Sequence, residues 1–230
     1  RGSAGVAGDC AVVSFQADNP DDFGLLLLAD FGPGTTLYVT DNGVQASGVL
    51  RRSEGIRSAQ LAGGASAGTV LRLADFGTAE EGSFALSTSG DQVIAFSGSP
   101  DAPTYMCALS ADGEAEWQAE ATSSATSALP PGLENGVSAL AIVERDNAAY
   151  GGDLRRGTAA ELRSAINDAD NWVGCDDAAC APPIPSEFTV TTTMVTATTT
   201  AAAASGAVRP AALTYLPPLC GLAVCSAWLG

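Results

Sequence analysis

A run of four leucines, Leu25 to Leu28, constrains the fold of this 230-residue chain more than any other feature. Turn residues lie on both sides of the run, and a short apolar run of this kind is typical of a strand buried on both faces. Periodicity alone leaves a buried helix open as the alternative. The alternating segment 10–15 and the β-branched segment 36–40 predict flanking strands. Residues 8–43 therefore predict three short strands joined by acidic, glycine-rich turns.

Beyond this region, turn residues recur roughly every ten positions, as is typical of a β-sandwich or barrel. Further strands are expected over residues 70–74, 84–86, 92–96, 104–109 and 137–143. Residues 44–67 have a weaker pattern and are expected to form a solvated edge region. Asn42 and Gly43 together give a strong hairpin signal. We therefore expect an all-β fold, an antiparallel β-sandwich.

One short helix is expected near the end of the sandwich. Thr158 and Glu161 have the spacing of a capping box, in which each side chain accepts a hydrogen bond from the backbone N–H of the other residue. The helix is predicted over about 159–168, with Leu162 and Ile166 on one face.

The composition divides the chain into three parts. They are a flexible lead-in over 1–8, a β-sandwich domain over 9–176, and a Pro/Thr/Ala-rich linker with an apolar, cysteine-containing tail over 177–230. The apolar segment 219–229 spans about 11 residues, whereas a membrane-spanning helix needs about 20, so we expect no membrane span. The Thr-rich segment 189–204 fits a glycosylated stalk, a disordered tail or a strand. A GPI-attachment signal near 205–207 is a further alternative.

The formal net charge is −16, with arginine as the only basic residue and no histidine. Phosphate binding needs clustered cations, so we expect no nucleic-acid partner and no binding to an anionic membrane surface. The lack of histidine excludes a Ser-His-Asp triad, a Cys-His pair and imidazole metal ligands. An enzyme of this composition has only carboxylates, hydroxyls, arginine and thiols to work with.

The six cysteines indicate disulfides and therefore an oxidising compartment. They are Cys10, Cys107, Cys175, Cys180, Cys220 and Cys225. Cys10 and Cys107 lie in predicted strands, where they can bridge or remain buried thiols. Each of the two close pairs can close a small loop or cross-pair with the other. No signal peptide is visible and the chain begins at Arg1, as expected of a mature or trimmed form. We expect a secreted, extracellular or cell-surface protein.

The candidate site is an acidic loop cluster around the early strands. Its members are Asp18, Asp21, Asp22 and Asp41, with Asp30 and the amide of Asn42 as further oxygen ligands. Calcium prefers six to eight oxygen ligands in flexible geometry, which loop carboxylates supply, so calcium is the candidate cofactor and no other is indicated. The alternative is that these residues serve turns and strand ends. A second acidic group, of Asp168, Asp170, Asp176 and Asp177, is interpreted as solvated charge.

Four segments together resemble a recurrent extracellular module. They are residues 8–43, 84–96, 122–133 and 165–172. The likeness covers about residues 8–174 and is to a lamin-tail-like domain, an immunoglobulin-like β-sandwich of secreted bacterial proteins that often carry calcium-binding repeats. It implies a fold and carries over no catalytic residues.

Two functions are open from the sequence. The first is a non-catalytic extracellular module for adhesion, matrix assembly or ligand recognition, stabilised by calcium and binding a protein or glycan partner. The alternative is a secreted, carboxylate-dependent hydrolase that acts on a phosphoester or a glycan. A catalytic site needs a concave pocket in which at least two carboxylates with perturbed pKa values converge.

Overall fold

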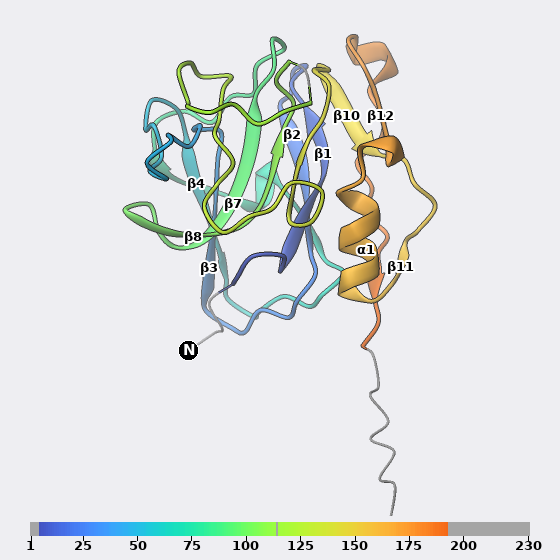
Figure 1. The fold of residues 1–230 in the computed structure, drawn as a ribbon. Coiled ribbons are helices and arrows are strands. Elements are labelled where there is room, and N and C mark those ends of the chain that lie inside the picture. The colour runs from blue at the N-terminus through green and yellow to red at the C-terminus, as the bar shows by residue number, and fades with distance from the viewer. Residues whose placement is uncertain (1–4, 114, 193–230) are drawn as a thin grey trace, which may run out of the picture. The chain divides into compact units, whose positions relative to one another are not determined.

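The computed structural model describes residues 5–113 and 115–192, which form mostly β structure with one short α-helix (Figure 1). The first sheet has the order β12 (Trp172–Cys175), β10 (Asn147–Tyr150), β1 (Cys10–Gln16), β2 (Asp22–Leu27), β5 (Val70–Arg72), and all its pairs are antiparallel. The all-β prediction with antiparallel sheets is confirmed.

The second sheet lies opposite the first and has six strands. Its order is β6 (Thr78–Glu81), β4 (Ile56–Leu61), β3 (Thr35–Thr40), β7 (Gln92–Ser99), β8 (Ala102–Ser110), β9 (Ala139–Ala141). All pairs are antiparallel except β8 with β9. A parallel pair joins β11 (Arg156–Gly157) to β13 (Thr189–Val190). The remaining elements are α1 (Ala159–Ile166) and the 3₁₀ turns η1 (Leu73–Asp75), η2 (Ala169–Asn171) and η3 (Ala178–Cys180).

The two sheets share one core, as expected of a sandwich-like arrangement. Its side chains come from both sheets, with Phe15 and Leu25 from the first and Leu37 and Val93 from the second. The disulfide between Cys10 and Cys107 connects β1 to β8 and so joins the sheets covalently. Of the two alternatives that the sequence left open for this pair, bridging is the one that the structure contains.

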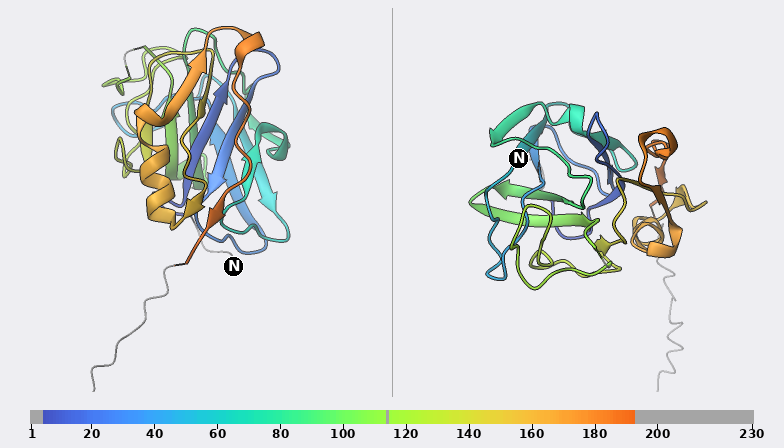
Figure 2. Two further views of the ribbon diagram at one scale, coloured as in Figure 1. Left: turned by 90° about the vertical axis from the view of Figure 1, so that its right-hand side faces the viewer. Right: turned by 90° about the horizontal axis from the view of Figure 1, so that it is seen from above.

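Leu25 to Leu27 form the second half of β2, and Leu28 follows the strand directly. Both faces of this leucine run are buried. Leu25 and Leu27 belong to the core between the sheets. Leu26 and Leu28 point the other way, into a second cluster that includes Leu162 of α1 and Phe188. Because side chains alternate along a strand, a run without polar residues requires a cover on each face. Here α1 and the segment before β13 provide the outer cover (Figure 2).

The helix begins as the sequence predicted. The Thr158 hydroxyl accepts a hydrogen bond from the Glu161 N–H at 3.2 Å, and the Glu161 carboxylate accepts one from the Thr158 N–H at 2.8 Å. Leu162 and Ile166 are fully buried. The helix ends at Ile166, two residues before the expected end at 168. No helix in the described part of the chain is long and apolar enough to cross a membrane.

The compact unit extends to Thr193, whereas the sequence analysis ends the domain at residue 176. Backbone bonds attach the later segment: the N–H of Thr189 donates to the Arg155 carbonyl at 2.9 Å, and that of Thr191 donates to Gly157 at 2.7 Å. The side chain of Phe188 is only 9% exposed. The proline-rich stretch therefore acts as a cover for the first sheet. The predictions for the stalk, the GPI signal, Cys220 and Cys225 lie outside the described residues.

Several local predictions differ from the structure. Residues 84–86 form no strand, while β4, β6, β10, β11 and β12 form where no strand was predicted. The N–H groups of Ala85 and Leu86 donate to carboxylates instead of to a neighbouring strand. The signal at Asn42 and Gly43 makes no hairpin, because the chain takes residues 41–55 to return from β3 into β4.

We predict that the two disulfides contribute unequally to stability. The Cys10–Cys107 bridge closes a loop of 97 residues and the Cys175–Cys180 bridge one of 5, so loss of loop-closure entropy predicts a cost of about 4–5 kcal/mol for the first and about 2 kcal/mol for the second. Urea unfolding of the two double alanine variants measures this. Equal losses in the two variants would contradict the prediction.

Candidate functional site

Four of the aspartates in the predicted acidic loop cluster, all except Asp30, lie at one end of the two sheets. Asp18 and Asp21 lie between β1 and β2, Asp22 begins β2, and Asp41 follows β3 in the opposite sheet. The Asp21 and Asp41 carboxylates accept hydrogen bonds from consecutive amides, Leu86 at 2.9 Å and Ala85 at 2.7 Å. Asp21 and Asp41 therefore lie at the same end of the two sheets, although β3 does not pair with β1 or β2.

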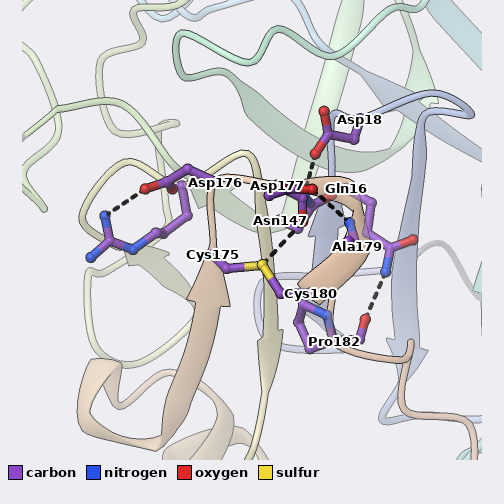
Figure 3. Close-up of a disulfide and its surroundings, with 10 residues drawn as sticks. Gln16, Asp18, Asn147, Cys175, Asp176, Asp177, Ala179, Cys180 and Pro182 are labelled. Carbon is purple, nitrogen blue, oxygen red and sulfur yellow. Dashed lines mark hydrogen bonds and ion pairs between the residues drawn. A yellow bond between two sulfur atoms is a disulfide. The ribbon is translucent and has the colours of Figure 1, made fainter.

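Two of the four predicted ligands are occupied elsewhere. Asp18 accepts a hydrogen bond from the Asn147 side-chain amide at 2.6 Å, as Figure 3 shows. Asp22 pairs with the guanidinium of Arg72 and accepts a bond from the Leu73 N–H at 3.1 Å. Only Asp21 and Asp41 remain together. Asp30 lies beyond the far end of β2 and binds the Ala67 N–H at 2.8 Å.

No group of three or more Cys, Asp or Glu side chains in residues 5–113 and 115–192 is arranged to hold a metal ion. The calcium site therefore remains a prediction, with the Asp21 and Asp41 carboxylates as its starting pair. The second acidic group behaves as expected from the sequence, because Asp168, Asp170, Asp176 and Asp177 are all exposed. The Cys175–Cys180 disulfide closes its own small loop beside them (Figure 3).

The sequence analysis missed the buried centre of this end. Asp91 is fully buried, and its carboxylate accepts hydrogen bonds from the N–H groups of Ser87 at 3.0 Å and Gln92 at 2.8 Å. The Gln92 side-chain amide donates to Asp91 at 2.8 Å, to the carbonyl of Ser124 at 2.8 Å and to the carbonyl of Asp41. One amide group thus links three loops.

Asn42 is the second organising side chain of this end. Its carbonyl oxygen accepts bonds from the N–H groups of Ser53 at 2.7 Å and Glu54 at 2.9 Å, and its amide donates to Gly55 O at 3.0 Å. Asp41 adds a bond from the Gly55 N–H at 2.7 Å. A Cβ on Gly43 would lie 2.1 Å from the carbonyl oxygen of Thr126. The Asn-Gly pair therefore serves loop docking and close backbone approach instead of a two-residue hairpin.

Three carboxyl groups in this network have strongly raised pKa values. Burial raises the pKa of Asp41 to about 6, that of Glu54 to about 7 and that of Asp91 to about 9. Repulsion adds to burial, since Asp41 raises the pKa of both Glu54 and Asp91. The N–H donors of Ser87 and Gln92 oppose the rise at Asp91. The network therefore takes up protons near neutral pH, which is unusual for aspartate and glutamate.

The described part of this network also contains polar atoms with no hydrogen-bond partner, Glu54 Oε2 and Gln92 Oε1. Five grooves on the described surface are lined by other residues, and none of them includes Glu54, Gln92, Asp41 or Asp91. The Asp41 and Asp91 carboxylates are fully buried and accept hydrogen bonds from backbone N–H groups of the loops. The sequence contains one signal for these buried polar residues: the pair Asp41-Asn42 follows a strand directly, and the pair Asp91-Gln92 lies at the beginning of another. Ordinary turns contain the same residue types, so the signal does not identify a buried network.

Two grooves with apolar side chains in their lining flank β12. A groove of about 530 Å³ is lined by residues that include Ile142, Val143, Trp172 and Val173. A second groove of about 430 Å³ lies between β10 and the proline-rich cover, and Val173 lines it too. The side chains of Val143 and Val173 are both 54% exposed.

Comparison with known proteins gives no relative: no family model, no curated protein and no solved structure matches the chain.

We predict that the protein loses stability as the pH rises. The folded-state pKa values of Asp41, Glu54 and Asp91 lie above the ordinary 3.8 and 4.5, so the folded chain binds more protons than the unfolded chain. This stabilisation is complete below about pH 4 and is lost as the pH rises through about 6, 7 and 9. Thermal melts from pH 5 to pH 9 should therefore show a falling midpoint.

A substitution pair separates this effect from general charge repulsion. Glu54→Gln should flatten the decline near pH 7, whereas Glu134→Gln, at an exposed site, removes the same charge and should leave the slope unchanged. Equal slopes for both variants and the parent chain would contradict the role of Glu54.

The calcium prediction has its own test. Excess calcium should raise the melting midpoint, and EDTA should reverse the rise, if Asp21 and Asp41 bind the ion through free oxygen lone pairs. Asp21→Asn should abolish the shift while keeping the acceptor oxygen for the Leu86 N–H. A midpoint that is the same in calcium and in EDTA removes calcium from the description of this protein.

Proposed function

We propose that this chain is a non-catalytic extracellular binding module that recognises a protein or glycan partner in adhesion or matrix assembly. The observation that carries the proposal is that two acidic groups with raised pKa values lie in the interior, whereas the grooves beside β12 are lined largely by apolar side chains. The Asp41 and Asp91 carboxyl groups, whose pKa values are raised, are buried and bind backbone N–H groups of loops, while the grooves beside β12 present aliphatic and aromatic side chains. Such grooves favour contact with a partner over acid–base chemistry.

The disulfides support the extracellular part of the proposal. Cys10–Cys107 and Cys175–Cys180 are both formed in the described region, and structural disulfides persist in oxidising compartments. The net charge of −16 favours solubility and disfavours nucleic acid as a partner. The likeness to lamin-tail-like domains, also a proposal, is supported by the antiparallel sheets and concerns the fold alone.

One observation favours a hydrolase as the second candidate. Glu54 is only partly buried, its pKa of about 7 suits a general acid, and the Asp41 carboxyl lies close enough to raise that pKa. Against this candidate, Asp41 is fully buried, and its carboxylate lines none of the five grooves described above. Binding therefore remains the better supported function.

A paired assay distinguishes the two functions. The full chain is applied to an array of extracellular-matrix proteins and glycans, and in parallel it is incubated with p-nitrophenyl phosphate and p-nitrophenyl glycosides. We expect saturable binding to array members and no turnover. Turnover that disappears in Glu54→Gln and persists in Glu134→Gln would establish the hydrolase and overturn the proposal, as would a chain that binds no array member.

A further inference from the structure

The edge strand β12 leaves part of its backbone unpaired. The Gly151 N–H donates to the Asn171 carbonyl at 2.7 Å, and the register continues without a break from Tyr150 opposite Trp172 to Asn147 opposite Cys175. In an antiparallel pair, bonded and non-bonded positions alternate. Trp172 and Gly174 therefore direct their backbone groups away from β10, toward the free edge of the sheet.

The groups available at this edge are specific. The Trp172 N–H is bonded to the Ala169 carbonyl, which leaves the Trp172 carbonyl and both backbone groups of Gly174. Gly174 is exposed, and no described residue outside the β10 ladder donates to it or accepts from it. An extended chain placed beside β12 can pair with these groups as an added strand.

The other edges offer less to an added strand. The edge at β6 carries Glu80 and Glu81, and charged side chains of this kind hinder strand addition. The edge at β9 is completely buried. The edge at β5 has one exposed residue, and it is the charged Arg72. Among the described edge strands of the two large sheets, β12 combines exposed backbone groups with an exposed apolar side chain, Val173.

Both faces of this edge are hollowed next to the free backbone groups. Trp172 and Val143 line the groove on one side, Tyr150 and Ile184 line the groove on the other, and Val173 borders both. Successive side chains of an added strand point to opposite faces. Apolar residues of a bound strand would therefore enter the two grooves in alternation, which is how added strands obtain specificity.

The charges at the two ends of β12 indicate which charge a bound strand would carry at its ends. The exposed Asp168 and Asp170 precede β12, and the exposed Asp176 and Asp177 follow it. Of the nearby arginines, Arg145 lies 3.6 Å from Asp176 and Arg155 stacks on the Tyr150 ring at 4.5 Å. A second copy paired through the same edge would bring these aspartates against each other, which like-charge repulsion disfavours.

We infer that β12 is a docking edge for an extended peptide segment of a partner protein, with apolar side chains on both of its faces and basic residues at its ends. The inference rests on the proposed binding function and names the surface and the class of partner. It explains why a short edge strand retains an exposed valine and an uncovered glycine backbone.

A designed peptide tests the inference on the full chain. The probe is a fluorescent heptapeptide of five valines with arginine at both ends, so that apolar side chains point to both faces. We expect saturable binding, slower hydrogen exchange of the Gly174 amide in the complex, and weaker binding of the same peptide with glutamate at its ends. Absence of binding, or equal binding of the two peptides, overturns the inference.

Two matched variants locate the binding site. Val173→Lys should weaken binding of the probe by at least about tenfold, because it removes the apolar contact and repels the basic ends. Val49→Lys makes the same change at a valine that is 52% exposed in a different groove, and it should have no comparable effect. Equal effects of the two variants overturn the assignment to β12.

The remaining outcomes concern other occupants. A Gly174 amide that is already protected in the free chain means that a second copy or another segment of this chain covers the edge, and dependence on protein concentration tells these apart. Either result overturns the inference. Array binding that survives Val173→Lys refutes the docking edge and leaves the binding function intact, whereas turnover without array binding refutes the function itself.

Discussion

The burial of β2 on both faces is the constraint on which the rest of this structure depends. Leu25 and Leu27 face the second sheet, and Leu26 and Leu28 face outward, so a two-layer sandwich alone would leave half of the run in water. Each exposed leucine would forfeit about 1.5–3 kcal/mol of burial free energy. The helix α1 and the segment that ends in β13 cover that face. Because they pack there, the compact unit includes the segment up to β13.

Burial also determines the structure of the acidic end of the sheets, because backbone groups that are buried there need hydrogen-bond partners. Loops that enclose a core must satisfy their backbone N–H groups. Here Asp41 and Asn42 accept those bonds from segments 11 to 44 residues away in the sequence, and Asp91 accepts them from Ser87 and Gln92 in its own loop. These carboxyl groups are poorly solvated, which disfavours their charged form and raises their pKa values. Acidic residues that look like ligands in the sequence are, in the fold, the supports of loops. Along β12, by contrast, backbone groups and the apolar side chain of Val173 remain uncovered among the described residues.

Much of the fold was predictable from local pattern. The strands around the leucine run and the capping box at Thr158 follow from short-range chemistry: side-chain alternation, capping geometry and turn residues. The site was predicted less well, because Asp18 and Asp22 differ from Asp21 and Asp41 only in their partners. Asn147 and Arg72 lie far along the chain, and nothing near the aspartates indicates them.

The sequence by itself determined that this protein is a disulfide-bonded β fold with strong negative charge and no imidazole chemistry, since these properties are set by composition and by patterns a few residues long. Only the tertiary structure decided which cysteines pair in the described region, which aspartates are buried, and that a short Trp-Val-Gly-Cys segment becomes an open sheet edge. Those outcomes depend on contacts between residues many positions apart. Their free energies come from burial and from hydrogen bonds that exist only once the chain has closed on itself.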